Sequence, residues 1–535
     1  MQSIWHLLTK WREFVAGRAY PQPPEYAGDD VVFGRFIEDS RIVQPNDCFV
    51  ARVRPYSNGH RFIAQAIAKG ATLIIAQAGE TIPDLPDNSP PIWIVPDTAI
   101  VLTWLAAAWH DFPAQQLTTI GVTGTDGKTS IANILYEMLV AAQLKTGMIS
   151  TIKAVIGNEE MPTGLHVTTP QAPQIQALLR RMVDDGCTHC VLEVTSMGLA
   201  EHRADTAFFD VAVMSNVKHE HLDYHGSWEA YLAAKMRLFE LAPMGIVNMD
   251  DVSAETIQAL PQKQLISYGI DNGALLMAES IEFSAEATRF ALTIGAPLFH
   301  EPASTLLSIR RLVLPIDTAL VGRFNIENIL AAAGVLMALG LHQQFVQQGI
   351  AALEVISGRM ERISAGQSFL TIVDFAHTPN ALLRAIEASR GMTNGRIISV
   401  FGSAGRRDVE KRRMMAEVSA QHADLTILTA EDPRQEPLAD ILQMMADGCI
   451  KYGGVENKTF WRIPDRGRAI YHALSLAQAD DLVLICGKGH EQSMCFGVIE
   501  YPWDDRDATR AVIGAFLAGE TTPDLGLPTF EGSQA

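Results

Sequence analysis

The chain has 535 residues, of which 48% are hydrophobic, and a formal net charge of −19 at pH 7. This length predicts about three domains of roughly 150 residues each. The acidic balance argues against non-specific binding to nucleic acid or to an anionic membrane surface.

Six cysteines in a chain of this length do not form a disulfide framework, so we expect a reducing compartment. Cys187 and Cys190 have CxxC spacing, but no second pair accompanies them, which favours buried thiols over a zinc or redox site. Residues 1–18 lack the unbroken apolar core of a secretory signal. The longest apolar run, residues 99–109, is about half of the ~20 residues that span a bilayer. We therefore expect a cytoplasmic monomer that acts on small molecules, without nucleic-acid or membrane partners.

The first unit, residues 1–114, is predicted to be a small α/β domain. Its strands are expected at residues 48–53, 71–76 and 92–95, with a helical segment at 61–68. Asp39-Ser40-Arg41 precedes the first of these strands. It could bind an anion or form an ordinary turn, and the sequence leaves both open.

The second unit, residues 115–356, begins with the most informative stretch, LTTIGVTGTDGKTSIANILYEML at 117–139. An apolar strand leads into a glycine loop and then into a helical pattern. Gly124 and Gly127 let the backbone approach phosphate oxygens, Lys128 adds a positive charge, and Thr129 or Ser130 can place a hydroxyl on a magnesium ion. The strict Walker spacing fails because Val122 occupies the first glycine position, but the shorter form still predicts a nucleotide phosphate loop.

Further apolar strands at 190–194, 211–214 and 245–248 alternate with helical patterns, which predicts a parallel sheet with ligands at its carboxyl edge. Glu193 lies inside the first of these strands and needs a cation or a donor. The stretch 216–239 holds His219, His221 and His225 and then Lys235 on a predicted helix. A second cation site and an ordinary solvated cluster both fit this stretch.

The third unit, residues 357–519, again alternates strands and helices, with strands expected at 369–374, 397–401, 425–428 and 482–486 and a final helix at 505–517. Polar clusters follow these strands: Asp374 with His377, then residues 406–412, 431–434 and 487–491. Such clusters at one sheet edge predict a substrate site, although each alone also fits an ordinary polar loop. The tail 520–535 is expected to be disordered.

Together these motifs resemble the Mur ligase family, the ATP-dependent amide ligases that extend the peptidoglycan precursor, and most closely its MurE type, which adds the third residue. The resemblance spans residues 33–515 and is carried by these motifs: Gly124 to Thr129, Thr168-Thr169-Pro170, Glu193 with Ser196, His221 to Gly226, Lys235, Phe324-Asn325 with Asn328, Gly358 to Glu361, Asp374 to Pro379, and Gly487 to Glu491.

The resemblance implies an α/β protein of three domains: an N-terminal UDP-sugar-binding domain, a central P-loop ATPase domain and a C-terminal Rossmann-like, amino-acid-binding domain. It implies transfer of the γ-phosphate of ATP to a carboxylate of UDP-MurNAc-L-Ala-D-Glu, giving an acyl phosphate that a diamino acid attacks. Arg434 can pair bidentately with a distal carboxylate, which favours meso-diaminopimelate over lysine or ornithine.

The resemblance also implies roles for individual residues. Catalysis is expected from Lys128, Glu193, His221 and Lys235. Magnesium would be held by Thr129, Ser130, Glu193, His221 and Lys235, the lysine as its N6-carboxy (carbamate) form. ATP would contact Gly124, Thr125, Asp126, Gly127, Lys128, Thr129, Ser130, Asn248, Asn325, Asn328, Arg359 and Asp374. The UDP-MurNAc-dipeptide would contact Ser40, Thr168, Thr169, Ser196 and Arg203. The amino acid would contact Arg407, Glu431, Asp432, Arg434, Gly487 and Glu491.

The chain departs from the family pattern at several positions. Glu431-Asp432-Pro433-Arg434 stands where the diaminopimelate enzymes usually have Asp-Asn-Pro-Arg, and the extra acid keeps lysine and ornithine open. Met197, Glu201, Glu220 and Arg406 replace a histidine, a glutamine and two aspartates. The alternatives to this function are a Mur-like ligase on another acid, of the folylpolyglutamate or cyanophycin type, and a non-catalytic nucleotide-binding module.

Overall fold

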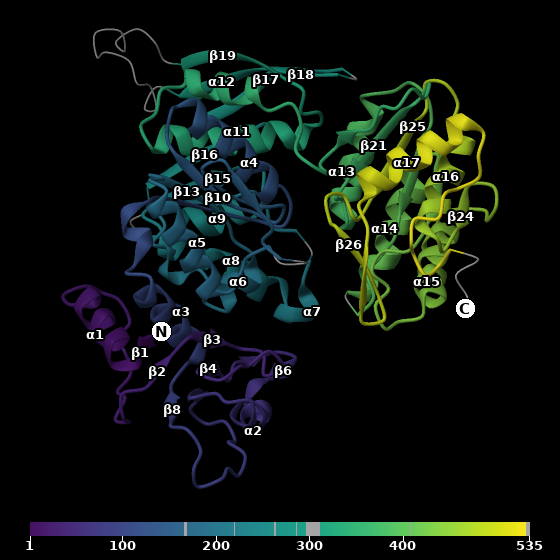
Figure 1. Cartoon of the computed structure of the whole chain (residues 1–535). Helices are drawn as coiled ribbons and strands as arrows, with labels where there is room; N and C mark the ends of the chain where they lie inside the picture. The colour runs from purple at the N-terminus through teal and green to yellow at the C-terminus, as the bar shows by residue number, and fades with distance from the viewer. Residues whose placement is uncertain are drawn as a thin grey trace.

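The structure, a computed structural model of the whole chain, describes residues 1–164, 168–218, 220–261, 264–284, 286–295, 311–406 and 408–530. Each of the three predicted units contains one main sheet, and Figure 1 shows the first unit below the second and the third unit beside it. The predicted α/β class with parallel sheets is confirmed.

The first unit is built on a parallel sheet of order β3-β4-β7-β8. Its helix α3 is the apolar run noted in the sequence, and it is buried along most of its length because α1 packs on it, with the rings of Trp11 and Trp104 stacked at 5.6 Å. The elements of this unit are β1 (Gln2–Ser3), α1 (Ile4–Val15), β2 (Val32–Phe33), β3 (Arg35–Ile37), β4 (Asp47–Val50), β5 (Val53–Arg54), β6 (Ser57–Asn58), α2 (Ile63–Ala68), β7 (Leu73–Gln77), β8 (Ile92–Val95) and α3 (Thr98–Trp109).

The described part of the second unit forms one sheet of order β12-β11-β10-β13-β9-β14-β15-β16-β17-β18-β19. Strands β10, β13, β9, β14, β15, β16 and β17 run parallel, and the two edges are antiparallel. The strands are β9 (Thr118–Thr123), β10 (Thr146–Ile149), β11 (Ala154–Ile156), β12 (Glu159–Met161), β13 (His189–Glu193), β14 (Val211–Met214), β15 (Met244–Asn248), β16 (Gln264–Gly269), β17 (Leu276–Phe283), β18 (Thr288–Gly295) and β19 (Arg311–Thr318).

Helices cover both faces of this sheet, which is why its central strands read as unbroken apolar runs. Residues of α4, α11 and α12 form one core with Ile120 and Val122, and residues of α5, α8 and α9 form the other with Leu192 and Ala212. The helices are α4 (Lys128–Ala141), α5 (Ala172–Asp184), α6 (Ser196–Ala200), α7 (Leu222–His225), α8 (Trp228–Leu241), α9 (Ser253–Gln258), α11 (Arg323–Ala338) and α12 (Gln344–Ala352). No helix among the described residues is both long and apolar enough to cross a bilayer.

The third unit has a sheet of order β20-β21-β25-β22-β23-β24, parallel except for β20. The sequence predicted β21, β22, β23 and β25 and missed β20, β24 and the hairpin β26–β27. The elements are β20 (Glu361–Arg362), β21 (Leu370–Asp374), α13 (Pro379–Arg390), β22 (Ile397–Phe401), α14 (Val409–His422), β23 (Leu425–Leu428), α15 (Leu438–Lys451), β24 (Phe460–Arg462), α16 (Arg466–Leu476), β25 (Leu482–Cys486), β26 (Ser493–Phe496), β27 (Ile499–Pro502) and α17 (Asp505–Ala518).

Residues 520–530, which the sequence assigned to a disordered tail, pack on the third unit. Leu527 is 2% exposed in the core around α16, and Thr529 Oγ1 donates a hydrogen bond to Asp465 Oδ2 at 3.0 Å. The guanidinium of Arg468 lies 4.6 Å from the ring centroid of Phe530. Apolar residues spaced among the prolines and glycines of this segment therefore anchor it; residues 531–535 lie outside the described part.

Candidate active site

The phosphate loop lies between β9 and α4, as predicted. Gly124 has φ +146° and Gly127 has φ +86°, conformations that favour glycine. A Cβ at Gly127 would lie 2.5 Å from Asn328 Oδ1, so the backbone passes close to α11. Lys128 Nζ donates hydrogen bonds to the carbonyl oxygens of Gly124 at 3.1 Å and Thr125 at 2.9 Å, which places its charge over the loop.

Asn216, which the sequence analysis did not select, fixes the shape of this loop. Its backbone carbonyl accepts a hydrogen bond from Thr125 N at 2.8 Å, and its side-chain oxygen accepts one from Asp126 N at 3.1 Å. Asn216 follows β14, the strand beside β9. Its place after a strand of the parallel sheet was the available signal, because carboxyl ends of neighbouring strands meet at one edge.

Glu193, at the end of β13, faces the first turn of α4. Thr129 Oγ1 donates to both carboxylate oxygens, at 3.0 and 3.1 Å, and Thr151 N donates to Oε2 at 2.9 Å. Arg359 Nη2, from the third unit, donates to Thr129 Oγ1 at 3.0 Å. Glu193 therefore faces hydrogen-bond donors, as expected of a carboxylate inside a strand.

His221 and Lys235 are two further predicted site residues of the second unit. Burial lowers the pKa of His221 to about 4, which leaves a neutral imidazole with a lone pair for a metal ion. Lys235 is 1% exposed; its Nζ donates to Gly124 O at 2.6 Å and lies 4.5 Å from the ring centroid of Tyr231. Burial, and then the neighbouring Lys128, push the pKa of Lys235 well below its usual range, which favours the neutral amine.

These residues fit a magnesium nucleotide and a modified lysine. Within the described residues no group of three His, Cys, Asp or Glu side chains could hold a metal on its own. A hard cation at this loop would therefore draw its oxygens from Thr129, Glu193 and the nucleotide phosphates, which is how magnesium is usually bound. A neutral buried amine is the form that combines with carbon dioxide, and the resulting carbamate would supply a further anionic oxygen.

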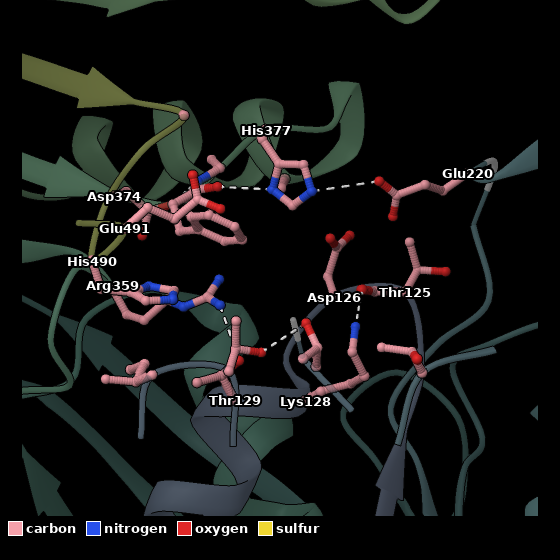
Figure 2. Close-up of a pocket in the computed structure, with 18 of the residues that line it drawn as sticks. Thr125, Asp126, Lys128, Thr129, Glu220, Arg359, Asp374, His377, His490 and Glu491 are labelled. Atoms are coloured by element: carbon pink, nitrogen blue, oxygen red, sulfur yellow. Dashed lines mark hydrogen bonds and ion pairs between the residues drawn. The ribbon is translucent and has the colours of Figure 1, made fainter. Parts of the chain in front are cut away.

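A cavity of about 620 Å³ between the second and third units, the interdomain cavity, brings most of the predicted site residues together (Figure 2). The predicted residues that line it are Thr125, Asp126, Gly127, Lys128, Thr129, Ser130, Thr168, Glu193, His221, Asn328, Arg359, Asp374, Glu431, Asp432, Arg434, Gly487 and Glu491. The carbonyl oxygen of Gly124 accepts hydrogen bonds from both Lys128 Nζ and Lys235 Nζ, which connects Gly124 and Lys235 to the cavity lining.

Other predicted residues lie behind the cavity wall. Thr169 Oγ1 donates to Glu193 O at 3.1 Å, and Arg203 Nη1 donates to Thr169 O at 2.9 Å. Ser196 Oγ lies 3.0 Å from His225 Nε2. The first two contacts connect Thr169 and Arg203, predicted dipeptide-binding residues, to the backbone of Glu193.

Three predicted residues are placed differently. Ser40 lies in a separate cavity of about 550 Å³ in the first unit, lined also by Arg52 and Arg54. Asn248 and Asn325 do not line the interdomain cavity. Asn248 Nδ2 donates to Ser215 O at 2.9 Å and Asn325 Nδ2 to Val321 O at 2.8 Å, so both support backbone beside the loop. Arg407 lies outside the described residues. The roles assigned to these residues stay predictions.

The motif Glu431 to Arg434 forms the far wall of the cavity. Asp432 Oδ1 accepts hydrogen bonds from Lys488 Nζ at 3.0 Å and Cys495 N at 2.9 Å. Lys488 is fully buried and also pairs with Glu491. Burial raises the pKa of Glu431. The guanidinium of Arg434, by contrast, has no hydrogen-bond or ion-pair partner in the part of the chain that the structure describes, and it lines the cavity.

Comparisons with known proteins give the family of the chain. Residues 122–336 match the Mur ligase middle domain, and residues 358–489 match the domain described as "Mur ligase, glutamate ligase domain". The UDP-N-acetylmuramyl-tripeptide synthetase of Roseiflexus sp. (strain RS-1) is 36% identical over 510 residues, covering 92% of this chain and 95% of the relative. The chain belongs to the Mur ligase family. It is therefore an ATP-dependent, amide-forming ligase, and the resemblance predicted from its motifs is confirmed.

Other relatives and solved structures extend this likeness. The UDP-N-acetylmuramoyl-L-alanyl-D-glutamate--2,6-diaminopimelate ligase of Xanthomonas campestris pv. campestris (strain 8004) is 37% identical over 489 residues, covering 89% of this Mur ligase and 93% of the relative. A solved structure of a ligase of that name is 28% identical with a TM-score of 0.59, covering 92% of this chain and 98% of that one. MurF from Acinetobacter baumannii, at 18% identity and a TM-score of 0.60 over 96% and 98% of the two chains, shares the fold.

Proposed function

We propose that this Mur ligase joins a diamino acid, meso-diaminopimelate, to UDP-MurNAc-L-Ala-D-Glu in the cytoplasm, with ATP, magnesium and an acyl phosphate intermediate. The observation that supports this proposal most directly is that one cavity is lined both by the phosphate loop, at 125–130, and by the amino-acid motif at 431–434. The diaminopimelate ligases among its relatives support the same assignment.

The residues of this chain divide the chemistry between them. Lys128 and the loop amides stabilise the charge on the phosphoryl group as it leaves ATP. The hydrogen bond from Thr129 to Glu193 holds the end of β13 against α4. This fixes the phosphate loop in the position from which it would face the dipeptide carboxylate. Magnesium, when bound, would supply positive charge that offsets the negative charge of the ATP phosphates. The cavity walls from two units keep water from an acyl phosphate that would otherwise hydrolyse.

The choice of diamino acid follows from charge pairing at the far wall. Asp432 is the extra acid that left lysine and ornithine possible as substrates in the sequence analysis. In the structure its carboxylate is paired with buried Lys488. Asp432 is therefore not a receptor for a second ammonium group. Arg434 offers five donors in a planar fork and lines the cavity, so it suits a distal carboxylate. Diaminopimelate has that carboxylate and lysine and ornithine do not.

The test is a reaction of purified protein, ATP and magnesium with UDP-MurNAc-L-Ala-D-Glu and each of diaminopimelate, lysine and ornithine. ADP release and product mass are measured. We expect ADP and a tripeptide product with diaminopimelate and at least about tenfold lower kcat/KM with the other two, since one charged pairing is lost. If ADP is released with a folate or a cyanophycin-type peptide instead, that acid and not UDP-MurNAc-L-Ala-D-Glu is the substrate. Nucleotide binding without ADP release from any acid would favour the non-catalytic module.

A further inference from the structure

Glu220, one of the departures from the family pattern, reaches from the second unit to the third. It precedes His221 and is 7% exposed. Its Oε1 lies 3.5 Å from His377 Nε2 and 3.7 Å from Lys411 Nζ. His377 follows β21 and Lys411 lies in α14, so one carboxylate meets two separate elements of the third unit. Figure 2 shows Glu220 and His377 pointing toward each other across the cavity.

His377 is itself held in place for this contact. Its Nδ1 lies 3.0 Å from the carbonyl oxygen of Phe375, and the two rings are 4.5 Å apart between centroids. A carbonyl oxygen only accepts hydrogen bonds, so Nδ1 must be the donor there. The contact orients Nε2 toward Glu220. A carboxylate also only accepts, so Nε2 must carry a proton as well, and the contact is an ion pair between Glu220 and the imidazolium of His377.

A second pair joins the same segment to the phosphate loop. Asn380 Nδ2, three residues after His377, donates to Asp126 Oδ2 at 2.8 Å. Two acids of the second unit, Glu220 and Asp126, therefore contact residues 377–380 of the third unit. Glu220 is the one of these two that also contacts α14, the helix that follows the 406–408 loop.

We propose that Glu220 is a positioning residue, an interdomain latch that holds His377 and Lys411 and so keeps the amino-acid subsite of the third unit in register with the phosphate loop. The latch goes beyond the proposed function, because it concerns how two units are held and not which acid is joined. An aspartate is shorter by one carbon–carbon bond, about 1.5 Å, and would not reach either partner. The two contacts therefore require the length of a glutamate.

The test measures the distance between the two units. Spin labels are placed on cysteines at Glu240 and Lys458, exposed positions of the second and third units, in the full chain. The six native cysteines are buried and should remain unlabelled. Glu220→Asp keeps the charge but shortens the side chain, and Glu220→Gln keeps the length but removes the charge. Glu229→Gln removes an exposed charge of the same unit and serves as the matched control.

We expect both Glu220 variants to broaden the label distances toward longer values and to raise KM for the amino acid about tenfold, while Kd for a non-hydrolysable ATP analogue changes less than twofold. Glu229→Gln should leave all three quantities unchanged. Lys411→Met, which removes a partner from the other side, should broaden the distances in the same direction, so the test does not depend on one variant folding.

Unchanged distances in both Glu220 variants would overturn the latch. So would a loss of ATP-analogue affinity without a change in distance, because that result would place Glu220 in the nucleotide site. The distance measurement needs no substrate, so its result is independent of the proposed reaction. The latch can be wrong while the ligase reaction is observed, and the reaction can be absent while the latch is observed.

Discussion

Lys235 Nζ donates a hydrogen bond to the carbonyl oxygen of Gly124 at 2.6 Å, although 111 positions separate the two residues in the chain. This contact places an amine of α8 directly under the phosphate loop, beside the charge of Lys128. Two ammonium groups there would repel each other and any divalent ion. A neutral Lys235, the form that burial and Lys128 favour, removes this repulsion.

The first prediction concerns this lysine. Lys235→Ala should lower kcat by at least about a hundredfold, because one charge-stabilising group at a transition state contributes roughly that much. Acetate or formate should partly restore kcat, since a small carboxylate can enter the space of the lost carbamate. The measurement is ADP release with and without added carboxylate. Full activity of the unrescued variant would exclude the carbamate, and Lys145→Ala, at an exposed ion pair of the same unit, is the control.

The second prediction concerns the choice of diamino acid. Arg434→Ala should reduce kcat/KM for diaminopimelate by about 10- to 100-fold, the cost of a hydrogen bond between charged groups, and reduce that for lysine much less. Arg462→Ala is the matched control. Arg462 lies at the end of β24 in the same unit, pairs with Glu456 and does not line the cavity. Equal losses for both amino acids would assign Arg434 a structural role.

Much of the fold could be predicted because its strands carry their own signal. The strands β9, β13, β14 and β15 are buried on both faces, so each is an apolar run that stands out between helical patterns. The strand β24 spans three residues, two of them half-buried, and β20 spans two. Segments this short have no periodicity to detect. Their pairing depends on the longer strands beside them, β21 and β23.

The site divides in the same way. Glu193 could be placed near the phosphate loop because it ends a strand of the same parallel sheet, whereas Asp374 ends a strand of the third unit's sheet and was assigned to the nucleotide by the resemblance alone. The pairing of Asp432 with Lys488, and of Glu220 with His377, joins side chains that lie 56 and more than 150 positions apart. Such pairs depend on loop conformation and on the arrangement of the units, which sequence spacing does not encode. The packed segment 520–530 was missed because composition alone suggested disorder.

The third prediction concerns the glycine that opens α4. Gly127→Ala should destabilise the protein by about 1–3 kcal/mol more than Gly453→Ala, measured by urea unfolding. The two glycines have φ +86° and +83°, so the backbone cost is matched, but a Cβ at Gly453 meets nothing within 4 Å. At Gly127 the Cβ would lie 2.5 Å from Asn328 Oδ1. Equal losses of stability in the two variants would show that α11 shifts away from the added methyl group without an energetic cost.

The fourth prediction concerns stability against pH. Glu201 joins the first and second units: its Oε2 lies 3.0 Å from Arg54 Nε and 3.1 Å from Arg203 Nη2. Burial alone would raise its pKa, but Arg203, Arg54 and Arg52 outweigh burial and hold the pKa below its ordinary 4.5. A lowered pKa means that the ionised carboxylate stabilises the folded protein above pH 4.5 and that this contribution is lost as the pH falls through the folded value.

Glu201→Gln should therefore be less stable than the wild type at pH 7, by about 2 kcal/mol, because the arginines lose a charged partner. As the pH falls below 4.5 the difference should shrink, since the wild-type carboxylate is protonated there as well. Urea midpoints measured across this range check the sign. The control is Glu255→Gln, at an exposed site on α9, which should track the wild type at every pH. A gap between wild type and Glu201→Gln that is constant with pH would mean that Glu201 acts through packing and not through its charge.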